Sequence, residues 1–92
     1  MLAMHGTAPY QNVRVEGDDP ALVEWLSTPL RAALAKRAAL YAVRIATVGR
    51  VGEVLVSVDG RNGHVPLLFR TEEMEPGYVC SVVLDTVQRY DI

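Results

Sequence analysis

Alternation of apolar and polar residues recurs three times in the second half of the chain and predicts three β-strands. The alternating runs span residues 43–48, 53–58 and 65–70. Glycine-rich connections at 49–52 and 59–64 separate them, as is typical of hairpin turns. Consecutive strands joined by short turns pair antiparallel, so these residues predict a three-stranded meander.

The register of this meander follows from its two connections. If Val58 faces Val65 across the second turn, and Val48 faces Glu53 across the first, both hairpins turn the same side of the middle strand inward. Two independent turns therefore predict one apolar face, which the helices of the chain would cover. That face collects Val43, Ile45, Val54, Val56, Val58, Val65, Leu67 and Phe69.

The opposite face of the predicted meander is mixed. Leu55 and Leu68 are cross-strand neighbours there, among polar residues. Pro66 cannot donate a ladder hydrogen bond, so its strand is expected at an edge or bulged. An apolar spot beside a sheet edge is a candidate contact for a partner, and Leu55 and Leu68 are accordingly candidate partner-binding residues.

The first half of the chain predicts a strand followed by helix. Residues 13–17 alternate like a short strand, and Asp19 before Pro20 is typical of a helix N-cap followed by proline at the first helical position. Because a second such pair occurs at Thr28 and Pro29, we expect a break near Ser27 and a longer helix over 29–41. The helical segment is thus predicted to be kinked.

The last segment, residues 78–90, fits either a strand or a helix. It holds four Val, two Tyr and one Thr but no Ala, and this composition favours a strand. The fold class is therefore predicted as α+β, an antiparallel sheet of about five strands in the order β-α-β-β-β-β, with the kinked helical segment packed on one face. The alternative is a final helix, β-α-β-β-β-α. Residues 1–10 are expected to form a loose arm, and 11–92 a single domain.

Composition narrows the class of protein further. The chain has 92 residues, half of them apolar, 22% charged, a net charge of -2 and one cysteine. A chain of this length has no room for a second domain, and a single cysteine can form no internal disulfide and no zinc site of the usual ligands. A net charge of -2 gives no overall attraction for polyanions. We find no secretory signal and no apolar run long enough to cross a membrane, so the cytoplasm is the expected location.

Three arginines are possible anion contacts. Arg50 and Arg61 each follow a glycine in a Gly-Arg-x-Gly turn, and Arg37 falls within the apolar arc of the predicted helix. The two turns lie at opposite ends of the strand they share, so they cannot clamp one phosphate. Glycines chosen for their backbone conformation, with arginines exposed beside them, are the simpler explanation of both turns.

No set of catalytic residues emerges from the sequence. His64 and Asp59 are expected to face each other across the second turn, but no nucleophile is placed beside them. Cys80 lies among apolar residues and is expected to be a buried, unreactive thiol. We therefore predict a protein that is not an enzyme and that needs no cofactor or metal.

An acidic loop provides the functional hypothesis. Glu72, Glu73 and Glu75 surround Met74. A solvated acidic loop is the simplest interpretation of this pattern. The functional interpretation is docking to a basic protein surface such as that of a nuclease or a nucleic-acid-binding complex, with Met74 as an adaptable apolar contact. The sequence thus indicates a small protein-binding inhibitor or neutraliser from microbial conflict, of the immunity-protein, antitoxin or phage anti-CRISPR kind. The alternatives are a structural or homo-oligomerisation subunit and a nucleic-acid binder acting through the arginine-containing turns.

Overall fold

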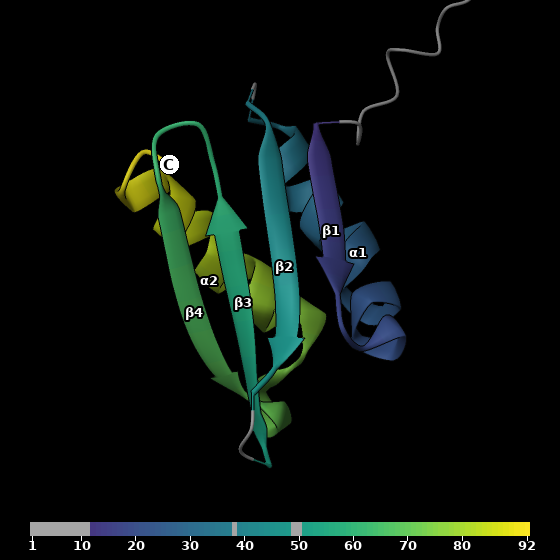
Figure 1. Ribbon diagram of the computed structural model, residues 1–92. Helices are drawn as coiled ribbons and strands as arrows, with labels where there is room; N and C mark the ends of the chain where they lie inside the picture. Colours follow the sequence, from purple (N-terminus) through teal and green to yellow (C-terminus); the bar gives the residue numbers. More distant parts are fainter. Residues whose placement is uncertain (1–11, 38, 49–50) are drawn as a thin grey trace, which may run out of the picture.

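The protein is a four-stranded sheet with two helices on one side (Figure 1). The computed structural model describes residues 12–37, 39–48 and 51–92, so the predicted arm at 1–10 lies outside the described residues. The elements, in chain order, are β1 (Val13–Gly17), α1 (Pro20–Ala35), β2 (Tyr41–Thr47), β3 (Glu53–Asp59), β4 (His64–Arg70), a short 3-10 turn η2 (Thr71–Glu73) and α2 (Pro76–Arg89).

The α+β class is confirmed, whereas the prediction of five antiparallel strands is wrong. The sheet has four strands in the order β1-β2-β3-β4. β1 pairs parallel to β2, and the other two pairings are antiparallel. A parallel pair needs a crossover, and α1 supplies it by returning the chain from the end of β1 to the start of β2. The sheet is therefore mixed.

The predicted register of the meander is confirmed. Val58 pairs with Val65 in one hairpin, and Ile45 pairs with Val56 in the other, as the two turns required. The predicted inward face is the one that the helices cover. Six of its eight residues are buried, and Val65 and Leu67, on the edge strand β4, are half-buried against the same core.

The N-cap of α1 is confirmed, but the predicted break near Ser27 is wrong. The Asp19 Oδ1 accepts a hydrogen bond from the Ala21 amide at 3.0 Å, and Pro20 occupies the first turn. α1 then continues through Pro29 as one helix and ends at Ala35, so Tyr41 belongs to β2. A proline inside a helix costs about 3 kcal/mol. Burial of three leucines at four-residue intervals along one stripe offsets this cost: Leu26, Leu30 and Leu34.

The final element is the helix α2, so the prediction of a strand over 78–90 is wrong and the alternative β-α-β-β-β-α is correct. The composition of the segment favours a strand, but strand propensity is a weak effect. The apolar burial that the segment gains by covering the sheet as a helix outweighs it. As a helix, the segment buries Val79, Val83 and Val87 on one face at helical spacing. Pro76 in the first turn is the start signal that the sequence contained.

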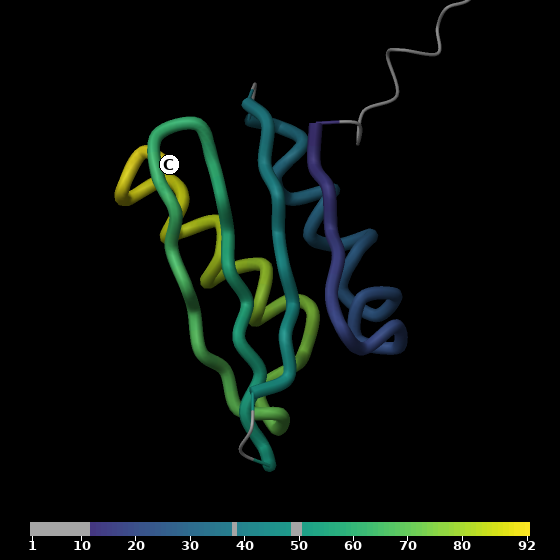
Figure 2. The backbone as a smooth tube through the Cα atoms, viewed as in Figure 1, coloured from purple at the N-terminus to yellow at the C-terminus, as the bar shows by residue number. Residues whose placement is uncertain are grey.

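Both helices lie on the same side of the sheet and run from one end of the molecule to the other (Figure 2). One end of the molecule, which we call the acidic end because of the carboxylates described below, contains the last residues of β1, β2 and β4. β3 and both helices begin at this end. The opposite end, where both helices finish and the β3–β4 turn lies, is the basic end. No helix among the described residues is long and apolar enough to cross a membrane.

Candidate functional site

Negative charge gathers at the acidic end. Among the described residues where strands end and helices start at this end, Arg70 is the basic one. Arg50, in the connection between β2 and β3, lies outside the described residues. The topology thereby joins the predicted acidic loop to carboxylates from the first half of the chain. The acidic residues at this end are Asp18, Asp19, Glu53, Glu72, Glu73 and Glu75.

Part of this acidic charge has a structural role. Both helices begin at this end, and negative side chains near a helix N-terminus offset its macrodipole. Asp19 caps α1, Asp18 accepts hydrogen bonds from the amide and hydroxyl of Thr47, and Glu73 accepts one from the Arg70 amide at 2.8 Å.

Glu72 and Glu75 differ from these residues, because both are exposed and neither side chain takes part in a hydrogen bond or ion pair within the described part of the chain. Their carboxylates remain available to a partner.

Large apolar side chains are exposed at the same end. Leu68, 59% exposed, lies directly opposite half-buried Leu55, so the two predicted residues form the expected spot on the open sheet face. On the helix side of the same end, Trp25 is 58% exposed and Tyr78 is 48% exposed, and Val51 is fully exposed in the first hairpin. Trp25 and Tyr78 were missed by the sequence analysis. An outward-facing tryptophan in an amphipathic helix was a usable signal, whereas Tyr78 was hidden by the mistaken strand.

The acidic end also contains a shallow hollow of about 370 Å3. It lies between the start of α1 and the first hairpin, and an apolar wall formed by Leu22, Val48 and Val51 meets the carboxylates of Asp19 and Glu53 at its rim. An apolar wall beside carboxylates suits the aliphatic stem and charged head of a lysine or arginine.

Met74 is not at the surface. Its side chain is 8% exposed and packs into the core, so the apolar group of the acidic loop points inward. The Trp25 indole Nε1 donates a hydrogen bond to the Met74 carbonyl at 2.9 Å. Together these two contacts fix the loop against α1, and thereby fix the positions from which Glu72 and Glu75 project.

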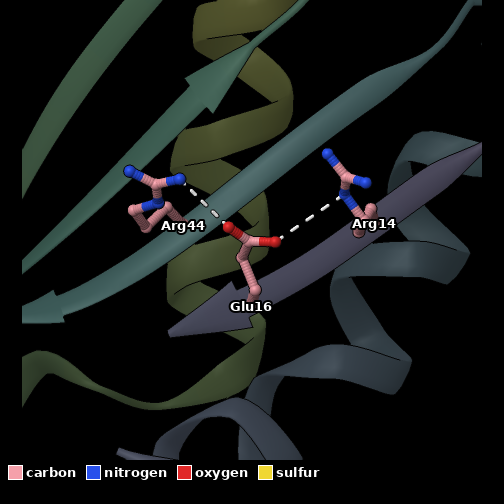
Figure 3. A network of polar contacts seen from close by, with 3 residues as sticks. All are labelled: Arg14, Glu16 and Arg44. Carbon is pink, nitrogen blue, oxygen red and sulfur yellow. Dashed lines mark hydrogen bonds and ion pairs between the residues drawn. The ribbon is translucent and has the colours of Figure 1, made fainter. Parts of the chain in front are cut away.

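The open face of the sheet carries ion pairs across its strands. Glu16 lies between Arg14 and Arg44, with its Oε2 3.0 Å from the Arg44 Nη2 and its Oε1 3.7 Å from the Arg14 Nε (Figure 3). At the basic end of the same face, the His64 Nδ1 lies 2.6 Å from the Asp59 Oδ1, as the register predicted. All five side chains are exposed, so these pairs contribute little stability.

The structure brings two of the three possible anion contacts together and separates them from the acidic loop. Arg37 and Arg61 both line a hollow at the basic end, together with Lys36. Arg50 lies outside the described residues. The sequence could not show this meeting, because Arg37 follows α1 and Arg61 lies in the β3–β4 turn.

Cys80 is half-buried on α2, and burial raises the pKa of its thiol. Because the thiolate is the reactive form, we expect alkylation by iodoacetamide at pH 7.5 to be about tenfold slower than in the urea-unfolded chain. Mass spectrometry of quenched time points measures both rates. Equal rates would contradict the buried, unreactive thiol.

The described residues contain no cluster of three or more His, Cys, Asp or Glu side chains that could hold a metal ion. Comparison with protein-family models, with curated proteins and with solved structures gives no match.

Proposed function

We propose that this chain is a non-catalytic binding protein whose acidic end docks onto a basic surface of another protein. The observation that carries the proposal is the presence, at one end of the molecule, of carboxylates without partners among the described residues and of exposed aromatic and aliphatic side chains. Glu72 and Glu75 supply the charge, and Trp25, Tyr78 and Leu68 supply the apolar contacts.

Charge and apolar surface contribute to binding in different ways. Exposed carboxylates at the rim of an interface accelerate association with a basic partner and select against acidic ones. Tryptophan and tyrosine, by contrast, are the residue types that most often provide the binding energy of an interface. A surface holding both has the composition expected of a specific protein-binding site rather than of a solvated acidic loop.

The partner that fits this surface is a protein with clustered lysines and arginines, such as a nuclease or a nucleic-acid-binding complex. One of its basic side chains would enter the hollow beside Asp19 and Glu53. Carboxylates presented to such a surface would compete with nucleic acid for the same positive charge. We therefore propose an inhibitor or neutraliser in microbial conflict, of the immunity-protein, antitoxin or anti-CRISPR kind.

Crosslinking followed by a binding measurement tests this proposal. A photoreactive amino acid at Leu68 would capture the partner in the native host, and the same group at Leu40, at the basic end, would not. With the captured protein purified, we expect the double variant E72K/E75K to bind about tenfold more weakly or worse, with the loss mainly in the association rate. Stopped-flow or surface plasmon resonance measures that rate.

A matched control is the double variant D59K/D85K, which changes the net charge equally but at other sites. Asp59 lies at the basic end and Asp85 lies far along α2, and both are exposed. We expect this variant to retain the wild-type affinity within about twofold. Equal losses in the two variants would show that net charge matters and that the acidic end does not form the interface.

A further inference from the structure

A hollow of about 390 Å3 opens at the basic end, between the end of α1, the β3–β4 turn and the residues after α2. Three of its lining side chains are basic, Lys36, Arg37 and Arg61, and one is acidic, Asp91. None of the three basic side chains forms an ion pair within the described part of the chain. The hollow therefore offers positive charge that no ion pair among the described residues neutralises.

Arg37 is held in place before any ligand binds. Its Nε donates a hydrogen bond to the Tyr41 hydroxyl at 2.7 Å, and that buried hydroxyl lies 3.2 Å from an oxygen of Ile92, to which it donates. The Asn12 side-chain amide also donates to the carbonyls of Arg37 and Ala39, at 3.2 and 2.8 Å. The backbone and the guanidinium are thus both fixed, and the two terminal nitrogens of the guanidinium remain for a ligand.

The turn that carries Arg61 is also anchored beside this site. The Gly60 amide donates to the Gly63 carbonyl at 2.8 Å, and the Asn62 side-chain amide donates to the Asp91 carbonyl at 3.2 Å. Asp91 has a left-handed backbone (φ 53°), and the Ile92 amide returns to the Val87 carbonyl at 3.1 Å. This arrangement closes α2 in the manner of a Schellman motif and brings Ile92 to the turn.

A second hollow, of about 450 Å3, adjoins the first and shares Ala39 and Arg61 with it. Leu40 lines it with a side chain that is 76% exposed, next to Gly60. Arginine donors beside an exposed leucine suit a ligand with an oxyanion at one end and an apolar group at the other. We propose that the basic end binds a small organic phosphate, with the phosphate at Arg37 and Arg61 and the organic group over Leu40.

A small ligand fits the surroundings better than a nucleic-acid strand does. A strand needs a continuous basic track for successive phosphates. Here Asp59 and Asp91 lie beside the hollow, and on the open sheet face Glu16 pairs with Arg14 and Arg44, so carboxylates interrupt any such track. Arg37 and Arg61 line one hollow, which matches a single phosphate group better than successive phosphates.

Nuclear magnetic resonance titration tests the proposal. Phenyl phosphate, inorganic phosphate and a short single-stranded oligonucleotide are added separately to the isotopically labelled chain at constant ionic strength. We expect saturable shifts of the Arg37, Gly60–Gly63 and Ile92 amides, with phenyl phosphate binding about tenfold more tightly because its ring covers Leu40. R61Q is expected to weaken both ligands about tenfold, and R37Q to do at least the same.

The control variant is R70Q, which removes an exposed arginine at the acidic end, and it is expected to bind as the wild type does. L40S should remove the advantage of phenyl phosphate while leaving inorganic phosphate unchanged. The proposal is overturned by non-saturating shifts, by equal affinity for the two probes, by R61Q binding as R70Q does, or by binding of an oligonucleotide alone. Because R61Q and R37Q leave the acidic end intact, this outcome is independent of the proposed protein-binding site.

Discussion

Replacing Leu30 with alanine is expected to destabilise the protein by about 2–5 kcal/mol. The Leu30 side chain is fully buried in the middle of the leucine stripe of α1, directly after Pro29. Its truncation removes apolar burial and leaves a cavity at the point where the helix already lacks one backbone hydrogen bond. Urea denaturation followed by circular dichroism measures the loss as a lower midpoint with an unchanged slope.

Leu40→Ala is the control for this prediction, because it removes the same atoms from a side chain that is 76% exposed. We expect its free energy of unfolding to stay within about 0.5 kcal/mol of the wild type. A comparable loss in both variants would mean that the stripe along α1 does not form the core. If Leu30→Ala proved neutral, packing would not be what keeps Pro29 inside one helix.

Replacing Gly17 with alanine has the second-largest expected effect, a destabilisation of about 3 kcal/mol. A Cβ atom at this position would lie 2.3 Å from the Ile45 carbonyl oxygen and 2.9 Å from the Val23 Cγ2. The carbonyl belongs to the backbone of β2, so it cannot move aside as a flexible side chain would. The parallel pairing of β1 with β2 would have to loosen where the chain turns into α1.

Gly63→Ala is the matched control, since a Cβ there would lie 3.7 Å from the nearest side-chain atom, an ordinary contact. We expect this variant to be neutral or slightly stabilised, because alanine reduces the freedom of the unfolded chain. Thermal unfolding of the two variants side by side measures the difference. If the Tm values of both variants matched the wild type, the close approach between β1 and β2 would be absent in solution.

Local patterns in the sequence determined much of the fold. The meander and its register followed from alternation and from two turn lengths, since a slip of one residue would turn the whole apolar face outward. The cap at Asp19 followed from the chemistry of the first helical turn. Leu55 and Leu68 were paired correctly for the same reason, and the His64–Asp59 pair came from the same register.

Two elements were predicted wrongly where tertiary packing outweighed a local preference. Pro29 predicts a break, but the leucine stripe holds α1 together against the sheet. The valines of α2 predict a strand, but the segment covers the apolar face better as a helix. In both cases the local preference is about 1–3 kcal/mol, which the burial of several apolar side chains exceeds.

The sequence by itself determined which residues alternate, where turns and caps occur, and that an acidic loop and an apolar spot exist. Only the tertiary structure decided that these two features share one end with Trp25 and Tyr78, and that Lys36, Arg37 and Arg61 meet at the other. The physical reason is the crossover of α1 and the direction of α2. Parallel helices over one sheet face bring together residues far apart in the chain, and no local pattern specifies that arrangement.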